Sequence, residues 1–230
     1  MKTNIVVLTG AGISAESGIR TFRDSDGLWE EYRIEDVATY DAWVRNQALV
    51  IDFYNQRRKQ LYQVEPNAAH YALAKLEQKY DVQIITQNID DLHERGGSTN
   101  IIHLHGELKK VRSTVDPDLI YTLDGWELKA GDKCEKGSQL RPHVVWFGEA
   151  VPLIEDAARA SSHADIFIVI GTSLAVYPAA GLLSYVPDES PKYLVDPQAS
   201  PLPWVKNLKI IREKAGIAVP ALVDELLGTA

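Results

Sequence analysis

Thr9-Gly10-Ala11-Gly12-Ile13-Ser14-Ala15 is the stretch that decides the fold of this 230-residue chain. It follows directly on the apolar run Ile5-Val6-Val7-Leu8, so it predicts a strand that turns sharply into a helix. Gly10, Gly12 and Ala15 match the spacing of small residues in dinucleotide-binding turns, where the backbone approaches a pyrophosphate and the helix N-terminus meets its charge. Because a glycine trio is a weak signal by itself, a tight strand-to-helix turn without a ligand stays an alternative.

Short apolar runs alternate with helical patterns along the rest of the chain, which is typical of parallel β-α-β construction. The run Ile166–Ile170 is apolar at every position, as expected of a strand that helices cover on both faces. The sequence therefore predicts an α/β fold with a Rossmann-like parallel sheet, helices on both of its faces and a smaller inserted subdomain. Strands are expected near residues 5–9, 82–86, 101–104, 165–170, 193–195 and 208–211.

Two segments interrupt this alternation and are expected to lie beside the sheet. Residues 31–79 contain a long helical pattern, with apolar positions recurring at spacings of three and four around Phe53 and Tyr54. Residues 111–140 are polar and rich in turn signals, with short strands. We predict a single domain over 1–230, with a Rossmann-like part at approximately 1–30, 80–110 and 141–230, and a small subdomain at approximately 31–79 (helical) and 111–140.

The segment after the glycine turn differs from that of an ordinary hydride-transfer enzyme. Such an enzyme has a second strand soon afterwards, ending in an acidic residue that holds the adenosine ribose. Here residues 21–29 are polar and turn-rich, typical of a loop near a cofactor, and the next strand starts only at Val82. A hydride-transfer oxidoreductase is therefore only a weaker alternative.

Polar residues follow the second and third predicted strands, as Gln87-Asn88-Ile89-Asp90 and His103-Leu104-His105-Gly106. Open parallel sheets bind ligands at the carboxyl ends of their strands, so these side chains are expected to converge on one crevice. Purely structural roles and a metal site stay open for the same residues. Asn88 and Asp90 could cap the next helix, and His105 could be a hydrogen-bonded core histidine or could pair with His103 on a metal, although no further ligands cluster nearby in the sequence.

Composition excludes some classes of partner. The formal net charge of -8 argues against general affinity for nucleic acid or anionic membranes, whereas a lysine-rich protein surface is compatible. No apolar stretch reaches membrane-spanning length, and because the first strand starts within a few residues of Met1 we expect no leader. The lone Cys134 fits a reducing compartment, so we expect a cytoplasmic protein.

Taken together, the motifs resemble those of the sirtuin family, in its order and approximate spacing over nearly the whole chain. The Ala15-Glu16-Ser17 version of the first motif resembles the class III branch, especially its bacterial members. The matching stretches are residues 10–19 with 21–23, 87–90, 105–106, 141–149 and 171–173.

This resemblance implies an NAD-dependent protein-lysine deacylase, with NAD as co-substrate and acyl-lysine proteins as partners. The acyl-lysine carbonyl oxygen attacks the nicotinamide ribose, nicotinamide leaves, and water finally releases free lysine and O-acyl-ADP-ribose. His105 is implied as the general base for the ribose hydroxyls, a role that suits the near-neutral pKa of an imidazole. Asn88 and Ser14 are implied to orient the ribose and a nearby water, and Asp90 to hold the nicotinamide carboxamide.

The resemblance also assigns the rest of the cofactor site. Phe22 and Arg23 are implied to fold over the reacting centre, and Asp196 to hold the adenosine ribose, where the family commonly has an asparagine. Gly171-Thr172-Ser173 could donate to phosphate or ribose oxygens, or could simply cap a helix. The full predicted set is Gly10, Ala11, Gly12, Ser14, Ala15, Thr21, Phe22, Arg23, Gln87, Asn88, Ile89, Asp90, Gly171, Thr172, Ser173, Asp196 and Ala215, the last in the turn that resembles the adenine contact.

Two further stretches bear on the acylated substrate. Val145-Trp146-Phe147-Gly148-Glu149 resembles the strip that pairs with the substrate peptide backbone. Tyr54 and Arg57 project from one helix face and resemble the class III pair that reads acidic acyl chains such as succinyl and malonyl. A guanidinium binds a carboxylate through two parallel hydrogen bonds. Without the resemblance, a solvated pair on a surface helix would explain them.

The chain departs from the family between residues 111 and 140, where a structural zinc is usually held by four cysteines. Only Cys134 is present and the segment has no histidine, so we predict that structural zinc is absent. Turns and apolar residues such as Val115, Ile120, Leu123 and Trp126 are expected to hold the segment instead. Two other functions stay open: a protein ADP-ribosyltransferase, and an NAD-binding module without deacylase activity.

Overall fold

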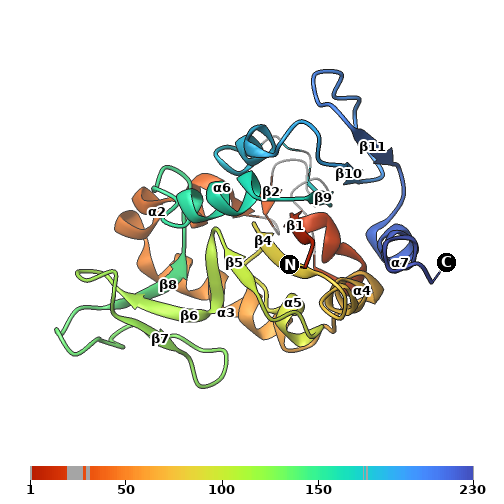
Figure 1. Ribbon diagram of the computed structural model, residues 1–230. Helices are drawn as coiled ribbons and strands as arrows, with labels where there is room; N and C mark the ends of the chain where they lie inside the picture. The colour runs from red at the N-terminus through yellow and green to blue at the C-terminus, as the bar shows by residue number, and fades with distance from the viewer. Residues whose placement is uncertain (1, 20–27, 30–31, 173, 175, 230) are drawn as a thin grey trace.

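The computed structural model describes residues 2–19, 28–29, 32–172, 174 and 176–229. Within these residues, six parallel strands form one sheet in the order β11-β10-β9-β1-β4-β5 (Figure 1). The predicted α/β class with a Rossmann-like parallel sheet is confirmed. The strands are β1 (Asn4–Thr9), β4 (Asp81–Thr86), β5 (Ile101–His103), β9 (Ile166–Ile170), β10 (Lys192–Val195) and β11 (Leu208–Ile211).

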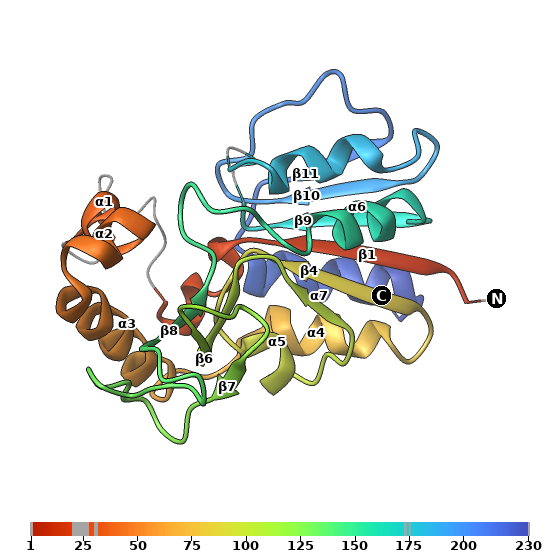
Figure 2. The same cartoon turned by 90° about the vertical axis from the view of Figure 1, so that its left-hand side faces the viewer.

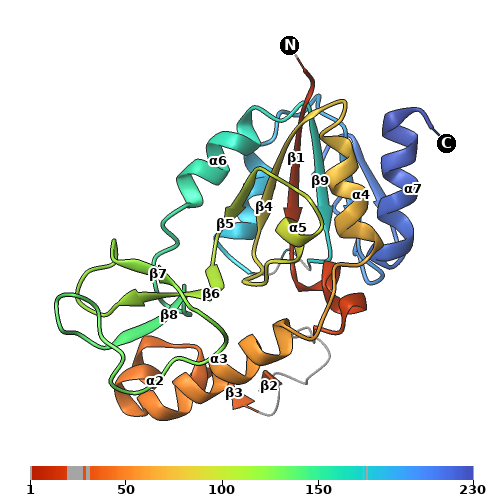
Figure 3. The same ribbon diagram turned by 90° about the horizontal axis from the view of Figure 1, so that it is seen from below.

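Helices cover both faces of this sheet because its central strands are apolar on both sides. In β1 the side chains of Ile5 and Val7 face one core, and those of Val6 and Leu8 face another. Figure 3 shows α6 on one side of the strands and α4 and α7 on the other. The covering elements are α4 (Ala68–Leu76) and α7 (Ala215–Leu227) against the first core, and α6 (Ile154–Ser162) and η4 (Ala179–Tyr185) against the second.

The glycine turn does not lead into a long helix as expected. It leads into two single 3-10 turns, η1 (Ala11–Ile13) and η2 (Ala15–Ser17). A three-residue turn has no substantial macrodipole, so the expected helix-dipole contribution to pyrophosphate binding is not available here. Phosphate contacts within this turn would come from individual backbone N–H groups.

A second lobe lies beside the sheet and has a core of its own (Figure 2). It contains α3 (Gln47–Leu61), which confirms the predicted long helix, and an antiparallel sheet in the order β7-β6-β8. The other elements are a β2-β3 pair (Leu28–Trp29 and Tyr32–Arg33), α1 (Ile34–Val37), α2 (Tyr40–Arg45), β6 (Gly106–Ser113), β7 (Ile120–Thr122) and β8 (Leu140–Val144). The antiparallel sheet thus extends beyond residues 111–140, because β6 starts before this segment and β8 ends after it.

Residues 111–140 are held only in part as we expected. Leu123 packs against the core of the second lobe, but Val115, Ile120 and Trp126 are exposed and cannot anchor the segment. Polar bonds to α3 do so instead: Asn55 exchanges two hydrogen bonds with the backbone of Leu128. The Arg58 guanidinium donates to the carbonyls of Leu108, at 2.8 Å, and Trp126, at 3.0 Å. Buried Val111 and Leu128 supply the apolar contact.

None of the described helices is both long enough and apolar enough to cross a membrane. The remaining short helix, α5 (Leu92–Arg95), follows β4 at the edge of the parallel sheet. It leads through a short turn into β5, whose end continues into β6 of the second lobe (Figure 3).

Candidate functional site

A cavity of about 760 Å³ opens at the carboxyl ends of the central strands. Both lobes contribute to its walls, so segments far apart in the sequence meet there. Of the predicted residues it is lined by Gly10, Ala11, Gly12, Ala15, Tyr54, Arg57, Gln87, Asn88, Ile89, Asp90, His105, Val145, Trp146, Phe147, Gly148, Glu149, Gly171, Thr172, Asp196 and Ala215. Thr21, Phe22, Arg23 and Ser173 lie outside the described residues.

The glycine turn packs tightly against the loop after β9. Gly10 N–H donates to the carbonyl of Ile170 at 3.0 Å, and Gly12 N–H donates to that of Gly171 at 2.9 Å. A Cβ on Gly12 would lie 2.6 Å from the Cα of Gly171, so no larger residue fits. The close contact between the two loops is therefore enough to require glycine at these positions, even without a ligand. Both loops also line the cavity.

Ser14 does not line the cavity but links two side chains that do. Asn88 Nδ2 donates to Ser14 Oγ at 3.1 Å and to the carbonyl of Gly10 at 3.2 Å. Ser14 Oγ donates in turn to Asp90 Oδ2 at 3.0 Å. All three side chains are buried. The chain of hydrogen bonds fixes the Asn88 amide and the Asp90 carboxyl relative to the glycine turn.

Burial raises the pKa of Asp90 to about 6, although hydrogen bonds from Leu92 N–H and Ser14 partly oppose the shift. The Leu92 bond, to Asp90 Oδ1 at 3.2 Å, means that Asp90 does help to cap α5, which was the structural alternative. Its other oxygen is bound by Ser14, and Asn88 makes no cap bond, so capping does not explain the whole group.

His105 is half-buried and faces the cavity from the turn after β5. Its Nδ1 lies 2.9 Å from the carbonyl oxygen of Gln87. Since a carbonyl only accepts, Nδ1 carries the proton in the neutral ring and Nε2 keeps a free lone pair. Burial lowers the pKa of His105, although the bond to Gln87 partly opposes this. The geometry therefore presents a neutral imidazole base.

His103 does not pair with His105. Its Nε2 lies 2.6 Å from Glu94 Oε1, and its Nδ1 lies 3.5 Å from the carbonyl oxygen of Asn88. The carboxylate of Glu107 is also close, so possible metal ligands do cluster around His103, contrary to the expectation from the sequence. The sequence did not indicate this cluster because Glu94 and Glu107 lie on separate elements and come together only in the fold.

Tyr54 and Arg57 lie in the wall that α3 contributes to the cavity. Both are buried, Tyr54 with none of its surface exposed and Arg57 with 7%, so they are not a solvated surface pair. The Tyr54 hydroxyl accepts a hydrogen bond from Trp146 Nε1 at 3.0 Å, and burial raises the pKa of Tyr54. The cavity thus has a cationic and a phenolic group side by side.

The strip from Val145 to Glu149 is partly committed to internal contacts. Val145 N–H donates to the carbonyl of His105, and Phe147 N–H donates to that of Ala38. The Glu149 carboxylate accepts two hydrogen bonds from Arg141, at 2.7 and 3.0 Å, and another from Trp146 N–H at 2.8 Å. Glu149 lines the cavity, and its carboxylate is committed to holding Trp146 and Arg141.

At the other end of the cavity lie Asp196 and Ala215. Asp196 is buried, and its Oδ1 accepts a hydrogen bond from Gln198 N–H at 2.8 Å. Thr172 Oγ1 accepts from Leu174 N–H, which is a turn rather than a helix cap. Sequence reasoning missed Glu16, Gln198 and Lys214, which also line this end.

Glu16 forms a long-range contact that the sequence did not indicate. Its Oε2 accepts a hydrogen bond from Gly216 N–H at 2.7 Å, in the first turn of α7. An acidic side chain at a helix N-terminus is favourable, so Glu16 ties the glycine turn to α7 across 200 residues of sequence. No local pattern could have indicated this pairing.

A profile of the Sir2 family matches residues 10–178. The chain belongs to the Sir2 family. It is 53% identical over 229 residues to an NAD-dependent protein deacylase of Bacteroides thetaiotaomicron, with 97% of this chain and 98% of the relative covered. It is also 53% identical to an NAD-dependent protein deacylase of Helicobacter pylori, with 99% of each covered.

Among solved structures, a Sir2 homologue in complex with NAD is similar, with a TM-score of 0.88 and 41% identity. That match covers 99% of this Sir2 family chain and 90% of the other. Because the similarity spans both lobes, it includes every part of the chain that lines the cavity.

Proposed function

We propose that this protein removes acyl groups from protein lysines in an NAD-dependent reaction that releases nicotinamide and O-acyl-ADP-ribose. The observation that carries the proposal is that His105, the glycine turn and the Tyr54-Arg57 pair share one cavity. A base and a backbone-lined cleft are parts that this reaction needs, and the Tyr54-Arg57 pair would select the acyl group. The relatives at 53% identity are NAD-dependent protein deacylases.

The cavity suits NAD as a co-substrate. Its volume of about 760 Å³ lies within the usual range for ligand pockets, roughly 300–1,000 Å³. Gly10 to Gly12 and Gly171 to Thr172 would accommodate the phosphates, with Asp196 and Ala215 at the adenosine end. Asn88, held by Ser14, would orient the nicotinamide ribose, and Asp90 would hold the carboxamide, as acceptor for its N–H groups.

His105 would accept a proton from a ribose hydroxyl once the acyl oxygen has displaced nicotinamide. Its orientation supports this role, because Nδ1–H is bound to the Gln87 carbonyl and Nε2 is left with its lone pair. The activated hydroxyl would take over the acyl group, and water would then release the lysine amine.

Acidic acyl groups would be preferred over acetyl. Arg57 is a buried cation in the cavity wall, and Tyr54 lies one helical turn away. A carboxylate at the far end of a succinyl or malonyl chain would form two charge-assisted hydrogen bonds with the guanidinium. An acetyl group has no carboxylate and would gain nothing from either side chain.

The substrate would be a protein segment with an acylated lysine, pairing through the backbone of the Val145–Glu149 strip. Val145 N–H and Phe147 N–H are already bonded, so the peptide would use the remaining backbone groups. The net charge of -8 favours lysine-rich partners and disfavours nucleic acid and anionic membranes. We place this reaction in the cytoplasm, on the lone cysteine of the sequence.

The direct test is mass spectrometry of the products formed from NAD and matched succinyl-, malonyl- and acetyl-lysine peptides. Deacylation predicts equal amounts of free lysine peptide, nicotinamide and O-acyl-ADP-ribose, and their absence with His105→Tyr. Labelled protein with intact acyl-lysine would instead indicate an ADP-ribosyltransferase. Bound NAD without any product would indicate a binding module, and accumulation of reduced nicotinamide would indicate an oxidoreductase.

A further inference from the structure

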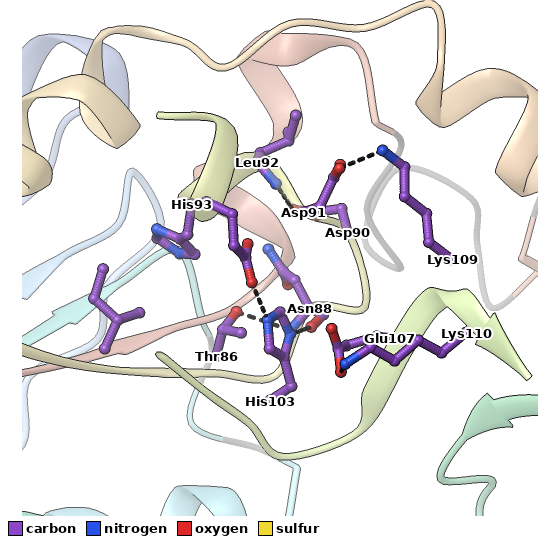
Figure 4. Close-up of polar contacts among 12 residues, drawn as sticks. Thr86, Asn88, Asp90, Asp91, Leu92, His93, His103, Glu107, Lys109 and Lys110 are labelled. Atoms are coloured by element: carbon purple, nitrogen blue, oxygen red, sulfur yellow. Dashed lines mark hydrogen bonds and ion pairs between the residues drawn. The ribbon is translucent and has the colours of Figure 1, made fainter. Parts of the chain in front are cut away.

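A cluster of possible metal ligands lies behind the wall of the cavity. Glu94 of α5, His103 at the end of β5 and Glu107 of β6 each offer one ligand atom, and these atoms all lie within 4.8 Å of one another. Figure 4 shows the His103 ring and the Glu107 carboxylate turned toward each other, with Asn88 adjacent. None of the three side chains has a role in the proposed deacylation.

His103 is oriented as a metal-binding histidine usually is. Its Nδ1 faces the carbonyl oxygen of Asn88 at 3.5 Å, and the ring is held in place, with only 9% of the side chain exposed. A carbonyl accepts, so Nδ1 carries a proton toward Asn88. The 2.6 Å approach of Nε2 to Glu94 Oε1 also requires a proton, which a metal ion bound to Nε2 would replace. A backbone carbonyl on the far ring nitrogen is a typical outer-shell partner of a ligating histidine.

We propose that Glu94, His103 and Glu107 form an open binding site for a divalent transition-metal ion, with Zn²⁺ as the preferred probe. One imidazole nitrogen and two carboxylate oxygens are ligands that zinc accepts, and water would complete the coordination. The imidazole disfavours Mg²⁺ and Ca²⁺, which prefer oxygen ligands. This site is separate from the family's cysteine zinc site and does not depend on the proposed function.

A simpler interpretation of the cluster is a pair of ion pairs. Glu94 Oε1 lies 2.6 Å from His103 Nε2, and Glu107 Oε2 accepts a hydrogen bond from Lys110 Nζ at 2.6 Å. Both pairs are partly exposed, and such pairs contribute little stability. A metal ion would replace the proton between His103 and Glu94 and would displace Lys110. Lys110 therefore competes with the metal, which separates the two interpretations.

The position of the cluster gives a bound ion a mechanical effect. β5 belongs to the parallel sheet and β6 to the antiparallel sheet of the second lobe, so the ion would join the two lobes. It would do so directly behind Asn88, whose side chain reaches the cavity. Metal bound only in the folded state should therefore raise the melting temperature of the whole chain.

The test is titration calorimetry of ZnCl₂ into the metal-stripped full-length protein and its variants. The site predicts one saturable ion per chain. His103→Asn and Glu107→Gln should each weaken binding by about tenfold or more, whereas Lys110→Met should tighten it. Thermal unfolding should follow the same order, with Zn²⁺ raising the melting temperature of the wild type and not that of His103→Asn.

Cys134→Ser is the matched control, because Cys134 is the one thiol in the sequence and could bind zinc by itself. It should bind as the wild type does. Loss of binding in Cys134→Ser, unchanged binding in both His103→Asn and Glu107→Gln, or no saturable binding in the wild type would each overturn the proposal. Weaker binding in Lys110→Met would equally favour the ion pairs over the metal site.

Discussion

Arg57 is the residue on which the substrate preference depends. A guanidinium on a side chain that is only 7% exposed has lost most of its water, so a carboxylate that reaches it gains more than it would at the surface. The ring of Phe53 lies near the same group, with its centroid 5.7 Å from the Arg57 Cζ. The cation is thus held ready for an acidic acyl chain before substrate arrives.

Arg57→Met should therefore change specificity rather than activity as a whole. A hydrogen bond to a charged group contributes about 1.5–3 kcal/mol, so kcat/KM for a succinyl-lysine peptide should fall roughly 10–100-fold. The value for the same peptide with acetyl-lysine should change much less. Arg57→Lys is the matched control and should recover part of the loss, since it keeps the charge without the paired geometry. Equal losses on both peptides would refute the pairing.

Ser14 does not line the cavity itself. It acts by positioning Asn88 and Asp90, to which it is hydrogen-bonded. In Ser14→Ala, Asn88 loses an acceptor and the Asp90 carboxyl loses a donor, which should cost about 1–3 kcal/mol. We expect kcat/KM for NAD to fall by about tenfold or more in steady-state kinetics with NAD varied. Ser162→Ala, at an exposed position of α6, is the control. If the two variants behaved alike, the proposed positioning role of Ser14 would be wrong.

Among the elements, the parallel strands were predictable and the second lobe was less so. Runs such as Ile166–Ile170 are apolar at every position, and burial on both faces leaves few other structures for them. The strands of the antiparallel sheet carry alternating polar residues, and β6 starts at Gly106, next to a motif that looked functional. The long-range contacts of Asn55 and Arg58 hold this part of the lobe against α3, and no local pattern reveals them.

In the cavity, too, some residues could be predicted from local sequence and others depend on long-range contacts. The strand-end motifs indicated His105 and Asn88 because the ends of parallel strands meet at one edge. The partner of Glu16 lies in α7, far away in the sequence, and the pairing of Glu94 with His103 behind the cavity wall also joins separate elements. Contacts of this kind depend on the packing of the whole chain, and the sequence specifies them only through the fold.

The close packing of the glycine turn against the loop after β9 can be tested by adding a single methyl group at Gly12. In Gly12→Ala the new Cβ would meet the Gly171 backbone at 2.6 Å, so one of the two loops must move. Overpacking of this kind costs about 1–3 kcal/mol, and the free energy of unfolding in urea should fall by that amount. Gly181→Ala is the control, since its Cβ would lie 3.9 Å from the nearest side-chain atom, and should change it by less than about 0.5 kcal/mol.

A loss of stability in Gly12→Ala should be accompanied by weaker NAD binding, because both loops line the cavity. Tight NAD binding together with unchanged stability would mean that the two loops adapt easily. The close approach would then not be the reason for the glycine.

For the molecule as a unit, acid should destabilise the fold through His70. This side chain belongs to α4 and is fully buried, and burial lowers its pKa to about 4. The titratable group that faces it is His93 of α5, with ring centroids 5.0 Å apart. The unfolded chain takes up a proton near pH 6.5 and the folded chain only near pH 4. Stability is thus complete above about pH 6.5 and falls as the pH drops toward 4, by up to about 3 kcal/mol.

Urea unfolding at neutral pH and near pH 4.5 checks this contribution. His70→Gln keeps a side chain that can complete the capping box with Asn67 but cannot titrate. The variant should lose clearly less stability on acidification than the wild type does, and His163→Gln, at an exposed histidine, should lose as much as the wild type. An identical loss in wild type and His70→Gln would place the acid-sensitive group elsewhere.

The missing cysteines of residues 111–140 lead to a prediction for the second lobe. Cys134 is buried and its Sγ lies within 3.3 Å of Ser113 Oγ and Ser138 Oγ, so hydrogen bonds surround the one thiol. In the His103→Asn variant, which removes the proposed outer site, a chelator should leave the melting temperature unchanged. Stoichiometric zinc in that variant, found by elemental analysis, would contradict a zinc-free subdomain.

The proposed deacylation requires His105 and Arg57 to act in one cavity. The His105 imidazole must reach the ribose hydroxyl of the cofactor, while the Arg57 guanidinium binds the carboxylate of the acyl chain. A crystal structure with ADP-ribose and a succinyl-lysine peptide, a pair that cannot react, measures both contacts at once. We predict that His105 Nε2 lies within about 3 Å of a hydroxyl of the terminal ribose, and the succinyl carboxylate at a similar distance from Arg57. A His105 ring turned into the protein interior, or a succinyl carboxylate in solvent away from Arg57, would contradict this mechanism.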